Sequence, residues 1–518
     1  MAILVIAPAG ATEEELKASR GALAAPRDGP PSAHSRRKSE KSDQFAQVML
    51  LALLFAVPAL MCVRGASVID PDVWWHLRAG EWLLQHHAVP TVDAFSGPLA
   101  GKPWLDYSWL FELVVVKLFE RLGLVGVLAY STAMILAITV ALYHLVRRLQ
   151  ADFSLAVLLT FVAGYGMAHL YTPRPWLFTI LFFVLELDIL MGARRTGRAR
   201  ELLWLPVIFA LWANLHIQFV DGLFVMGIAL MESLLALRGG GGQTRIRPVW
   251  MAGALLASAL ATLLNPYGWR IYSVAIDLAT QGGALNKVSE LQAIPFRDLS
   301  HFLILALAMG SAAALAWQRR FLPFESGLLA FAAVLSFRSQ RDVWLIATVA
   351  AAILASTITG REKAAVRMPR LATALAVMVA ALAVVAGFRA MHVNNDRLEA
   401  QVAASLPARA VEVIREKGYA ASPNGPLYND FNWGGYLVWA LRVPVSIDGR
   451  QNLYGDQRID RSVATWSAEP DWASDAQLMS AGVVIGPVKA PLTQVLRTDP
   501  RFQLVFEDKI AAVFVARK

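Results

Sequence analysis

The sequence predicts a mainly α-helical protein: a polytopic transmembrane bundle with a small α/β domain at its C-terminal end. Hydrophobic residues make up 56% of the 518 residues and charged residues only 17%, whereas soluble domains contain about 25% charged residues. Apolar runs of membrane-spanning length recur along the chain, and the loops between them are alternately basic and poor in cations. These observations together exclude an ordinary soluble protein.

Residues 1–44 are rich in Ala, Pro, Ser and charge, so we expect a disordered tail. Basic residues at 36–38 and 41 precede the first apolar run and should hold this tail in the cytoplasm. The net charge of +9 does not indicate nucleic-acid binding, because the cations lie mainly in short loops beside apolar runs, where they set membrane topology.

The transmembrane domain should cover residues 45–390 with about eleven spans, a number uncertain by about two because several runs are short. The predicted spans are 46–65, 124–146, 154–171, 176–193, 202–216, 219–237, 248–265, 301–317, 323–337, 342–357 and 370–389. The short basic loops face the cytoplasm. An odd number of spans then places residues 391–518 outside the cytoplasm.

The first outer segment, 66–123, should contain amphipathic helices that lie in the membrane interface. Trp75, Trp82 and His86 fall on one helical face, and tryptophan favours the interface. A second helix is expected over 107–121.

Four chemically active residues lie at the start of this segment: Asp70, Asp72, His76 and Arg78. A bare carboxylate in hydrocarbon costs several kcal/mol, so both aspartates must be hydrated or paired. Asp72 could simply cap the following helix, but Asp70, which precedes Pro71, has no such explanation. Together the carboxylates could hold a divalent cation or take a proton from an acceptor. A solvated helix face would explain His76 and Arg78 nearly as well.

Three arginines at the same side of the membrane are candidate phosphate ligands. Arg174 lies in a turn between two prolines, where it could bind phosphate or reach up to headgroups. Arg338 and Arg341 are three residues apart, which would bring them together on a helix and make a seat for a lipid phosphate. Pairing with Asp342 is the structural alternative. His169 is either interfacial or part of the same site.

Two further outer residues are candidates. His216 lies at the end of a predicted span, at a depth in the membrane where a leucine would have a lower free energy. We therefore expect its side chain to face the bundle interior. Glu290 lies in the longest outer loop between spans, where simple solvation would also explain it.

The C-terminal region, 391–518, reads as a small α/β domain. A helix is expected from Arg397 to Lys417, ending at Gly418. Short β-like runs predict strands at 427–428, 443–447, 483–485, 503–506 and 511–515.

Two polar stretches of this domain stand out. Trp433 lies in Asn-Asp-Phe-Asn-Trp-Gly-Gly-Tyr, and Asp448 and Arg450 lie in Ile-Asp-Gly-Arg. The glycines permit close backbone approach and turns, and a polar aromatic loop can also hold a sugar or peptide. The sequence has no Walker loop, no GxGxxG after a strand and no CxxC or HExxH pattern, so it gives no support to cytoplasmic nucleotide chemistry.

The stretch Asp-Pro-Asp-Val-Trp-Trp-His-Leu-Arg, the many spans and the Trp-Gly-Gly-Tyr of the outer domain resemble the GT-C superfamily of integral-membrane glycosyltransferases. The resemblance is greatest to catalytic subunits of oligosaccharyltransferases, and the motifs are also similar to those of a group of uncharacterised bacterial membrane proteins. It implies a multi-pass protein of the bacterial inner membrane that moves a sugar from a polyprenyl-phosphate-linked donor to an acceptor on the outer face.

By this resemblance Asp70 corresponds to the family's acidic loop residue, and Asp72 is the neighbouring candidate. Trp433 falls at the outer-domain tryptophan motif, but Gly434 stands where an acidic residue would be. The family's second acidic motif is missing from the turn at 169–174. A Mg²⁺ or Mn²⁺ cofactor at Asp70 and Asp72, and a peptide acceptor, are therefore open.

The first hypothesis is a glycosyltransferase in which Asp70 or Asp72 deprotonates or orients the acceptor while Arg174, Arg338 and Arg341 offset charge on the leaving phosphate. The alternatives are a transporter or flippase of a lipid-linked sugar and a non-catalytic envelope scaffold. Transport would favour polar residues in the inner halves of the spans, and few are present. The partners expected are the bilayer and the lipid-linked sugar; the oligomeric state is not predicted.

Overall fold

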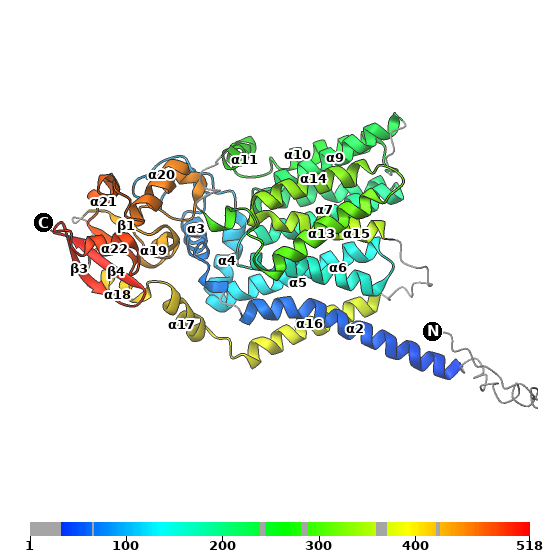
Figure 1. Ribbon diagram of the computed structural model, residues 1–518, viewed down its shortest axis with the longest axis horizontal. Helices are drawn as coiled ribbons and strands as arrows, with labels where there is room; N and C mark the ends of the chain where they lie inside the picture. The colour runs from blue at the N-terminus through cyan, green and yellow to red at the C-terminus, as the bar shows by residue number, and fades with distance from the viewer. Residues whose placement is uncertain are drawn as a thin grey trace, which may run out of the picture.

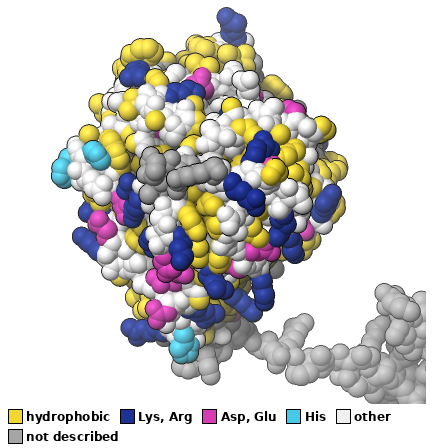
Figure 2. Space-filling view, turned by 90° about the vertical axis from the view of Figure 1, so that its left-hand side faces the viewer, with side chains coloured by type: hydrophobic (Ala, Val, Ile, Leu, Met, Phe, Trp, Pro, Cys, Tyr) yellow, Lys and Arg dark blue, Asp and Glu magenta, His cyan; other side chains and the backbone are white. Residues whose placement is uncertain are grey.

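The computed structural model describes residues 33–64, 67–238, 244–280, 288–358, 370–420 and 425–517. A bundle of long helices forms one part of the molecule, and the C-terminal domain is docked on one end of it (Figure 1). Helices α3 and α4 lie between the two parts. Figure 2 shows the end that carries the C-terminal domain, where basic and acidic side chains are interspersed with apolar ones.

Every predicted span contains a helix, so the polytopic helical fold is confirmed. The bundle helices are α2 (Ala33–Arg64), α5 (Leu124–Leu149), α6 (Phe153–Gly166), α7 (Trp176–Thr196), α8 (Leu205–Leu215), α9 (Phe219–Leu237), α10 (Pro248–Ala261), α13 (Leu299–Ala316), α14 (Pro323–Arg338), α15 (Val343–Thr357) and α16 (Arg370–Ala390). In the described chain six of them are long and apolar enough to cross a membrane: α2, α5, α7, α9, α13 and α16. The number of spans stays a prediction.

The burial pattern follows from the composition of each helix. Helix α15 is apolar on all faces, and every residue from Val343 to Ala355 is buried, as expected for a helix at the centre of a bundle. Helix α16 packs on α2 and exposes Leu371, Leu375, Leu382 and Val385. A row of exposed large apolar side chains on a spanning helix is suited to lipid.

The predicted outer and inner loops separate to opposite ends of the bundle. At one end Asp70 contacts Arg174, and Gln218 donates to Asp342. At the other end Arg148 pairs with Asp188 and Glu201. The basic residues at 361, 363 and 367, which also belonged to the predicted cytoplasmic loops, lie outside the described residues.

Two N-terminal expectations need correction. Helix α2 begins at Ala33, so residues 33–44 of the predicted disordered tail are helical, while residues 1–32 lie outside the described residues. In the first outer segment, η1 (Ser67–Ile69) leads to α3 (Val73–His86) and α4 (Trp109–Leu122). Trp75 is not an interfacial anchor: it is 6% exposed, because α3 packs against α4 and the C-terminal domain.

The C-terminal domain has a four-stranded sheet in the order β1-β2-β4-β3, with β1 parallel to β2 and the other pairs antiparallel. Its strands are β1 (Leu427–Asn429), β2 (Val483–Pro487), β3 (Phe502–Glu507) and β4 (Ala511–Ala516). Its helices are α17 (Asn395–Ser405), α18 (Ala408–Glu416), α19 (Gly434–Leu441), α20 (Gln451–Trp466), α21 (Ala476–Met479) and α22 (Pro491–Leu496). Four of the five predicted strands are present.

Proline explains both errors in this domain. The predicted strand at 443–447 is absent: Pro444 cannot donate to a ladder, and the segment makes only an isolated bridge between Val445 and Ser96. The single helix predicted over 397–417 is two helices, because Pro407 holds Leu406 in an extended conformation (φ −110°, ψ 160°). The helix does stop before Gly418, whose φ is +64°.

Short helical segments complete the connections between spans. They are η2 (Ala168–Leu170), η3 (Ala199–Trp204), η4 (Gly268–Arg270), α11 (Ile271–Thr280), η5 (Ser289–Leu291) and η6 (Gln340–Asp342). Apart from η3, these segments belong to the outer loops and surround the candidate site.

Candidate functional site

Arg174 is the centre of a carboxylate cluster at the outer end of the bundle. Its Nε lies 2.7 Å from Asp70 Oδ1, its Nη1 contacts Asp72, and its Nη2 lies 3.8 Å from Glu290. The turn that carries it is held by a hydrogen bond from Tyr130 Oη to the Arg174 carbonyl (3.0 Å). Residues more than a hundred positions apart are thus brought into direct contact.

The two aspartates are held by this cluster rather than by helix capping. Asp72 precedes α3 but makes no side-chain cap, which removes the structural explanation offered for it from sequence. Asp70 Oδ1 also accepts the Asp72 backbone N–H (3.0 Å). Burial, opposed by Arg174, raises the pKa of Asp72 to about 7. Burial alone would lower the pKa of Arg174, but the surrounding carboxylates hold it above its usual value.

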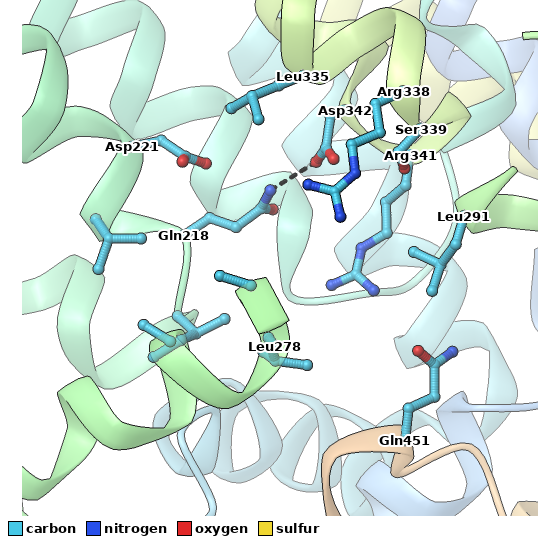
Figure 3. Close-up of a pocket in the computed structure, with 14 residues that line it drawn as sticks. Gln218, Asp221, Leu278, Leu291, Leu335, Arg338, Ser339, Arg341, Asp342 and Gln451 are labelled. Carbon is cyan, nitrogen blue, oxygen red and sulfur yellow. Dashed lines mark hydrogen bonds between the residues drawn. The ribbon is translucent and has the colours of Figure 1, made fainter. Parts of the chain in front are cut away.

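A cavity of about 220 Å³ lies beside this cluster and contains both Arg338 and Arg341. Figure 3 shows the two guanidinium groups extending into it from neighbouring positions, with Gln451 of the C-terminal domain opposite Arg341. They are not on one helix, because α14 ends at Arg338 and Arg341 lies in η6. Asp342 accepts a hydrogen bond from Gln218 (2.7 Å). In the described chain no ion pair joins Asp342 to either arginine.

Two further cavities adjoin the first, and Arg341 lines all three. A slot of about 40 Å³ is lined by Asp72, Trp75, His76, Tyr107, Arg174, Trp176, His216, Glu290, Arg341, Gly449 and Gln451, among others. A third cavity, of about 260 Å³, is lined by Asp70, His169, Leu170, Thr172, Trp176, Ser289, Glu290, Gln340 and Arg341. The carboxylate cluster and the arginine pair therefore form one polar region.

The other predicted outer residues divide between this region and its surroundings. Glu290 bridges Arg174 and Arg341, at 3.8 and 3.9 Å. His216 lies in the slot, and its Nδ1 is 2.8 Å from Thr179 Oγ1. His169 is exposed, with its Nε2 3.1 Å from the Gln340 carbonyl. Arg78 lines none of the three cavities; it pairs with Glu81 (3.2 Å).

His76 is not on a solvated face. It is 3% exposed, and its Nδ1 lies 2.9 Å from Oε1 of Glu112 on α4, which is fully buried. Glu112 was not among the residues predicted from the sequence. It is the acidic residue inside the apolar run Trp-Leu-Phe-Glu-Leu-Val-Val-Val. Such a position could have indicated it, because a buried carboxylate needs a partner.

Asp448 and Arg450 join the C-terminal domain to the first outer segment. Arg450 lies 2.6 Å from both Asp448 and Asp93, and all three residues are buried. Its guanidinium also lies over the rings of Phe95 and Trp104, at 5.2 and 4.8 Å. This is a docking contact and not a lining of the cavities.

The glycines of the two C-terminal motifs allow the domain to approach the aspartates. A Cβ at Gly435 would lie 2.6 Å from the Pro71 carbonyl, and one at Gly449 would collide with the Asp72 carboxylate. Trp433 is buried and lines none of the three cavities. Gln451 and Asn452 do line the slot, although their sequence gave no signal.

The carboxylates do not form a prepared site for Mg²⁺ or Mn²⁺. The guanidinium of Arg174 lies between Asp70 and Asp72 and pairs with both. Within the described ranges no group of three or more His, Cys, Asp or Glu side chains is arranged to hold a metal ion. A divalent cation at the two aspartates would require Arg174 to move.

The chain folds as a helical bundle with a small C-terminal α/β domain docked on one end, and a solved structure shows a similar fold. The chain is similar to the archaeal oligosaccharyltransferase AglB from Archaeoglobus fulgidus, solved with an inhibitory peptide and a dolichol-phosphate. The TM-score is 0.52 at 12% identity, over 87% of this chain and 70% of that one. This likeness confirms the GT-C-like fold predicted from the sequence.

Two further solved structures are similar at a TM-score of 0.46 and 13% identity. An Archaeoglobus fulgidus oligosaccharyltransferase in complex with Zn and sulfate matches over 84% of this chain and 68% of that one. ArnT from Cupriavidus metallidurans, bound to undecaprenyl phosphate, matches over 91% and 97%. No protein-family model and no curated protein matches the sequence.

Proposed function

We propose that this protein is a GT-C-type glycosyltransferase that moves a sugar from a polyprenyl-phosphate-linked donor to an acceptor at the outer face of the membrane. The observation that carries the proposal is the position of Arg341, which lines the arginine cavity, the slot and the Asp70 cavity together. A phosphate at Arg341 would place the attached sugar next to the carboxylate cluster.

In this proposal Arg338 and Arg341 bind the donor phosphate. Their cavity has apolar walls, including Leu278 and Leu335, and a polar floor, which suits a phosphate joined to an isoprenoid. Arginine donors can bind phosphate oxygens in pairs and offset the charge that grows when the sugar leaves. Arg174 is engaged by three carboxylates, so its role is to hold Asp70 and Asp72 in place.

The carboxylates act on the sugar and its acceptor. As the bond between the sugar carbon and the phosphate oxygen breaks, the leaving polyprenyl phosphate keeps the electron pair. Asp70 and Asp72 orient the incoming hydroxyl and stabilise positive charge on the sugar. Gly449 and Gln451 bring the C-terminal domain against the same slot, so that domain contributes to acceptor binding.

We place this site outside the cytoplasm, in a bacterial inner membrane. The opposite end of the bundle carries the short basic loops, with Arg147, Arg148, Arg194 and Arg195 at the ends of α5 and α7, and such loops stay in the cytoplasm. This arrangement supports a cytoplasmic N-terminus and an extracytoplasmic C-terminal domain.

The inner halves of the spans favour an enzyme over a transporter. Asp188 is paired with Arg148, and Glu232 and Glu325 with Arg194. Acids neutralised in this way do not supply a polar path for a sugar across the bilayer. Glu186 on α7 is also buried, and neither of its carboxyl oxygens has a hydrogen-bond partner among the described residues, but a single acid does not form a continuous path.

The proposal is tested with the full chain in lipid nanodiscs and a radiolabelled undecaprenyl-phosphate hexose. Binding and release of the hexose to water or to a membrane extract are measured together. An enzyme binds the donor and releases hexose, a transporter binds without release, and a scaffold does neither. Arg341→Ala should weaken donor binding about tenfold or more, whereas Arg270→Ala, at an exposed position of the same end, should leave it unchanged.

A further inference from the structure

Behind the proposed site lies a buried pair formed by His76 and Glu112. His76 Nδ1 is 2.9 Å from Glu112 Oε1. The imidazole ring is confined on both sides, with its centroid 3.6 Å from that of Trp75 and 4.9 Å from that of Phe111. The ring therefore has one orientation, in which Nδ1 is engaged.

The other edge of the imidazole is available to the slot. His76 lines this slot with Asp72, Arg174 and Gly449, and no described residue makes a hydrogen bond to its Nε2. A volume of about 40 Å³ admits a water molecule or a single hydroxyl, but not a sugar ring. The slot therefore has room beside His76 for a water molecule or for a hydroxyl group.

Glu112 has a second buried carboxyl group beside it. Glu112 Oε2 and Asp106 Oδ2 are buried without a hydrogen-bond donor, and the two side chains interact. Burial and Asp106 raise the pKa of Glu112 well above its usual value. One proton shared between the two carboxyl groups satisfies both oxygens and leaves a single negative charge on the pair.

We propose that His76 takes the proton from the acceptor hydroxyl, and that Glu112 and Asp106 are positioning residues that keep its proton on Nδ1 and its Nε2 free. This inference rests on the proposed glycosyl transfer and assigns its general base. The arrangement follows general chemistry: a carboxylate at one imidazole nitrogen fixes the tautomer and leaves the other nitrogen as a base.

The step balances within the site. The acceptor oxygen forms a bond to the sugar carbon, the bond from that carbon to the phosphate oxygen breaks, and the acceptor proton moves to His76 Nε2. The resulting imidazolium is stabilised by the charge of the Glu112–Asp106 pair. Burial, together with Arg174 and His216, lowers the pKa of His76 well below its usual value, so the imidazole is neutral at pH 7. The proton moves to it only as the acceptor oxygen bonds to the sugar carbon, because the hydroxyl becomes far more acidic at that point.

Other charged and titratable groups face His76 and will influence its titration. They are Asp106 and Tyr107 before α4, Glu112 on α4, Asp72 before α3, Arg174 before α7, His216 after α8, Glu290 on η5 and Arg341 on η6. A pH profile must therefore be compared between variants.

The test compares His76→Gln, Glu112→Gln and His86→Gln in nanodiscs with the radiolabelled undecaprenyl-phosphate hexose. His76→Gln should lower kcat about a hundredfold or more without changing donor binding. Glu112→Gln keeps an oxygen for Nδ1–H and leaves the single charge on Asp106, so it should lower kcat only slightly. Glu112→Gln combined with Asp106→Asn removes that charge, so it should lower kcat further and shift the acid side of the pH profile to lower pH. His86, exposed on the same helix, is the matched control.

A second measurement does not depend on turnover. Nitrogen NMR of histidine-labelled protein, with His76→Gln used for assignment, should show His76 neutral with its proton on Nδ1. A proton on Nε2, or a His76→Gln variant with full kcat, overturns the base assignment while glycosyl transfer stands. If the unchanged protein binds the donor but never releases hexose, the proposed function and this inference both fail.

Discussion

Helix α7 has an arginine surrounded by carboxylates at each end, and the two ends differ in how completely the arginine is satisfied. At the inner end Arg194 is 2.7 Å from both Glu232 oxygens and 3.0 Å from Glu325, over the ring of Phe324. At the outer end Arg174 holds Asp70 and Asp72 closely but Glu290 only at 3.8 Å.

The arginine with fewer close partners is also the one that lies beside a cavity. Arg194 and its partners are buried and line none of the cavities described above, whereas Arg174 borders a slot that continues past Arg341 into larger space. A closed, fully paired cluster contributes to stability and specificity of packing. An open cluster with an incompletely engaged carboxylate can bind a ligand. An arginine with carboxylate partners thus occurs in two different surroundings near the two ends of one helix.

The largest effect on stability is expected when the closed cluster is broken. Arg194→Met leaves two buried carboxylates without their cation, which costs about 3–5 kcal/mol. The variant should unfold at lower temperature in detergent and accumulate poorly, and thermal unfolding followed by circular dichroism measures this. Unchanged stability would show that the inner cluster is not the structural one.

At the open end the expected loss is in turnover. Asp70→Asn should reduce hexose release about a hundredfold or more, because it removes a charge that orients the acceptor and holds Arg174. Insertion and purification should be normal. If Asp70→Asn transfers hexose at the full rate, or is as unstable as Arg194→Met, the assignment of function to the outer cluster and of stability to the inner cluster is wrong.

The arginine pair should affect donor binding more modestly. Arg338→Ala and Arg341→Ala each remove a charged hydrogen-bond partner, worth about 1.5–3 kcal/mol, so Kd for the undecaprenyl-phosphate hexose should rise about tenfold or more. Arg341→Ala should have the larger effect since Arg341 lines all three cavities. Equal Kd values for Arg341→Ala and Arg270→Ala would place the phosphate elsewhere.

The smallest expected effect is a pH dependence of stability from Asp72. Its folded pKa, about 7, lies above the usual aspartate pKa of 3.8, so the folded state binds the proton more tightly than the unfolded state. The stabilisation is present below about pH 4 and is lost as the pH rises toward 7. The unfolding temperature of Asp72→Asn should vary less over this range than that of the unchanged protein.

Hydrophobic patterning was sufficient to predict the helices of the bundle, because a long apolar run between basic loops rarely forms anything other than a membrane helix. It failed where a local residue overrode the pattern, as at Pro407 and Pro444. Asp70, Arg174 and Arg341 could be proposed as site residues because a charged side chain near the membrane has a high free energy unless it is hydrated or paired. Which of them contact one another could be seen only in the tertiary structure.

Other parts of the site had no sequence signal of their own. Gln451 lines the slot only because Arg450 and Asp448 dock the C-terminal domain against Asp93. Conversely, Asp448 and Arg450 looked like site residues because buried ion pairs and catalytic groups use the same side chains. Burial and partner distances, which sequence does not contain, distinguish them.

The most direct test is a cryo-electron microscopy structure of the full chain in nanodiscs with undecaprenyl phosphate. We expect the phosphate at the outer end, within hydrogen-bonding distance, about 3 Å, of Arg341, with Arg194 still closed on its two glutamates. A phosphate bound at the inner end, or one seated away from Arg338 and Arg341, would contradict the assignment of function to the open cluster.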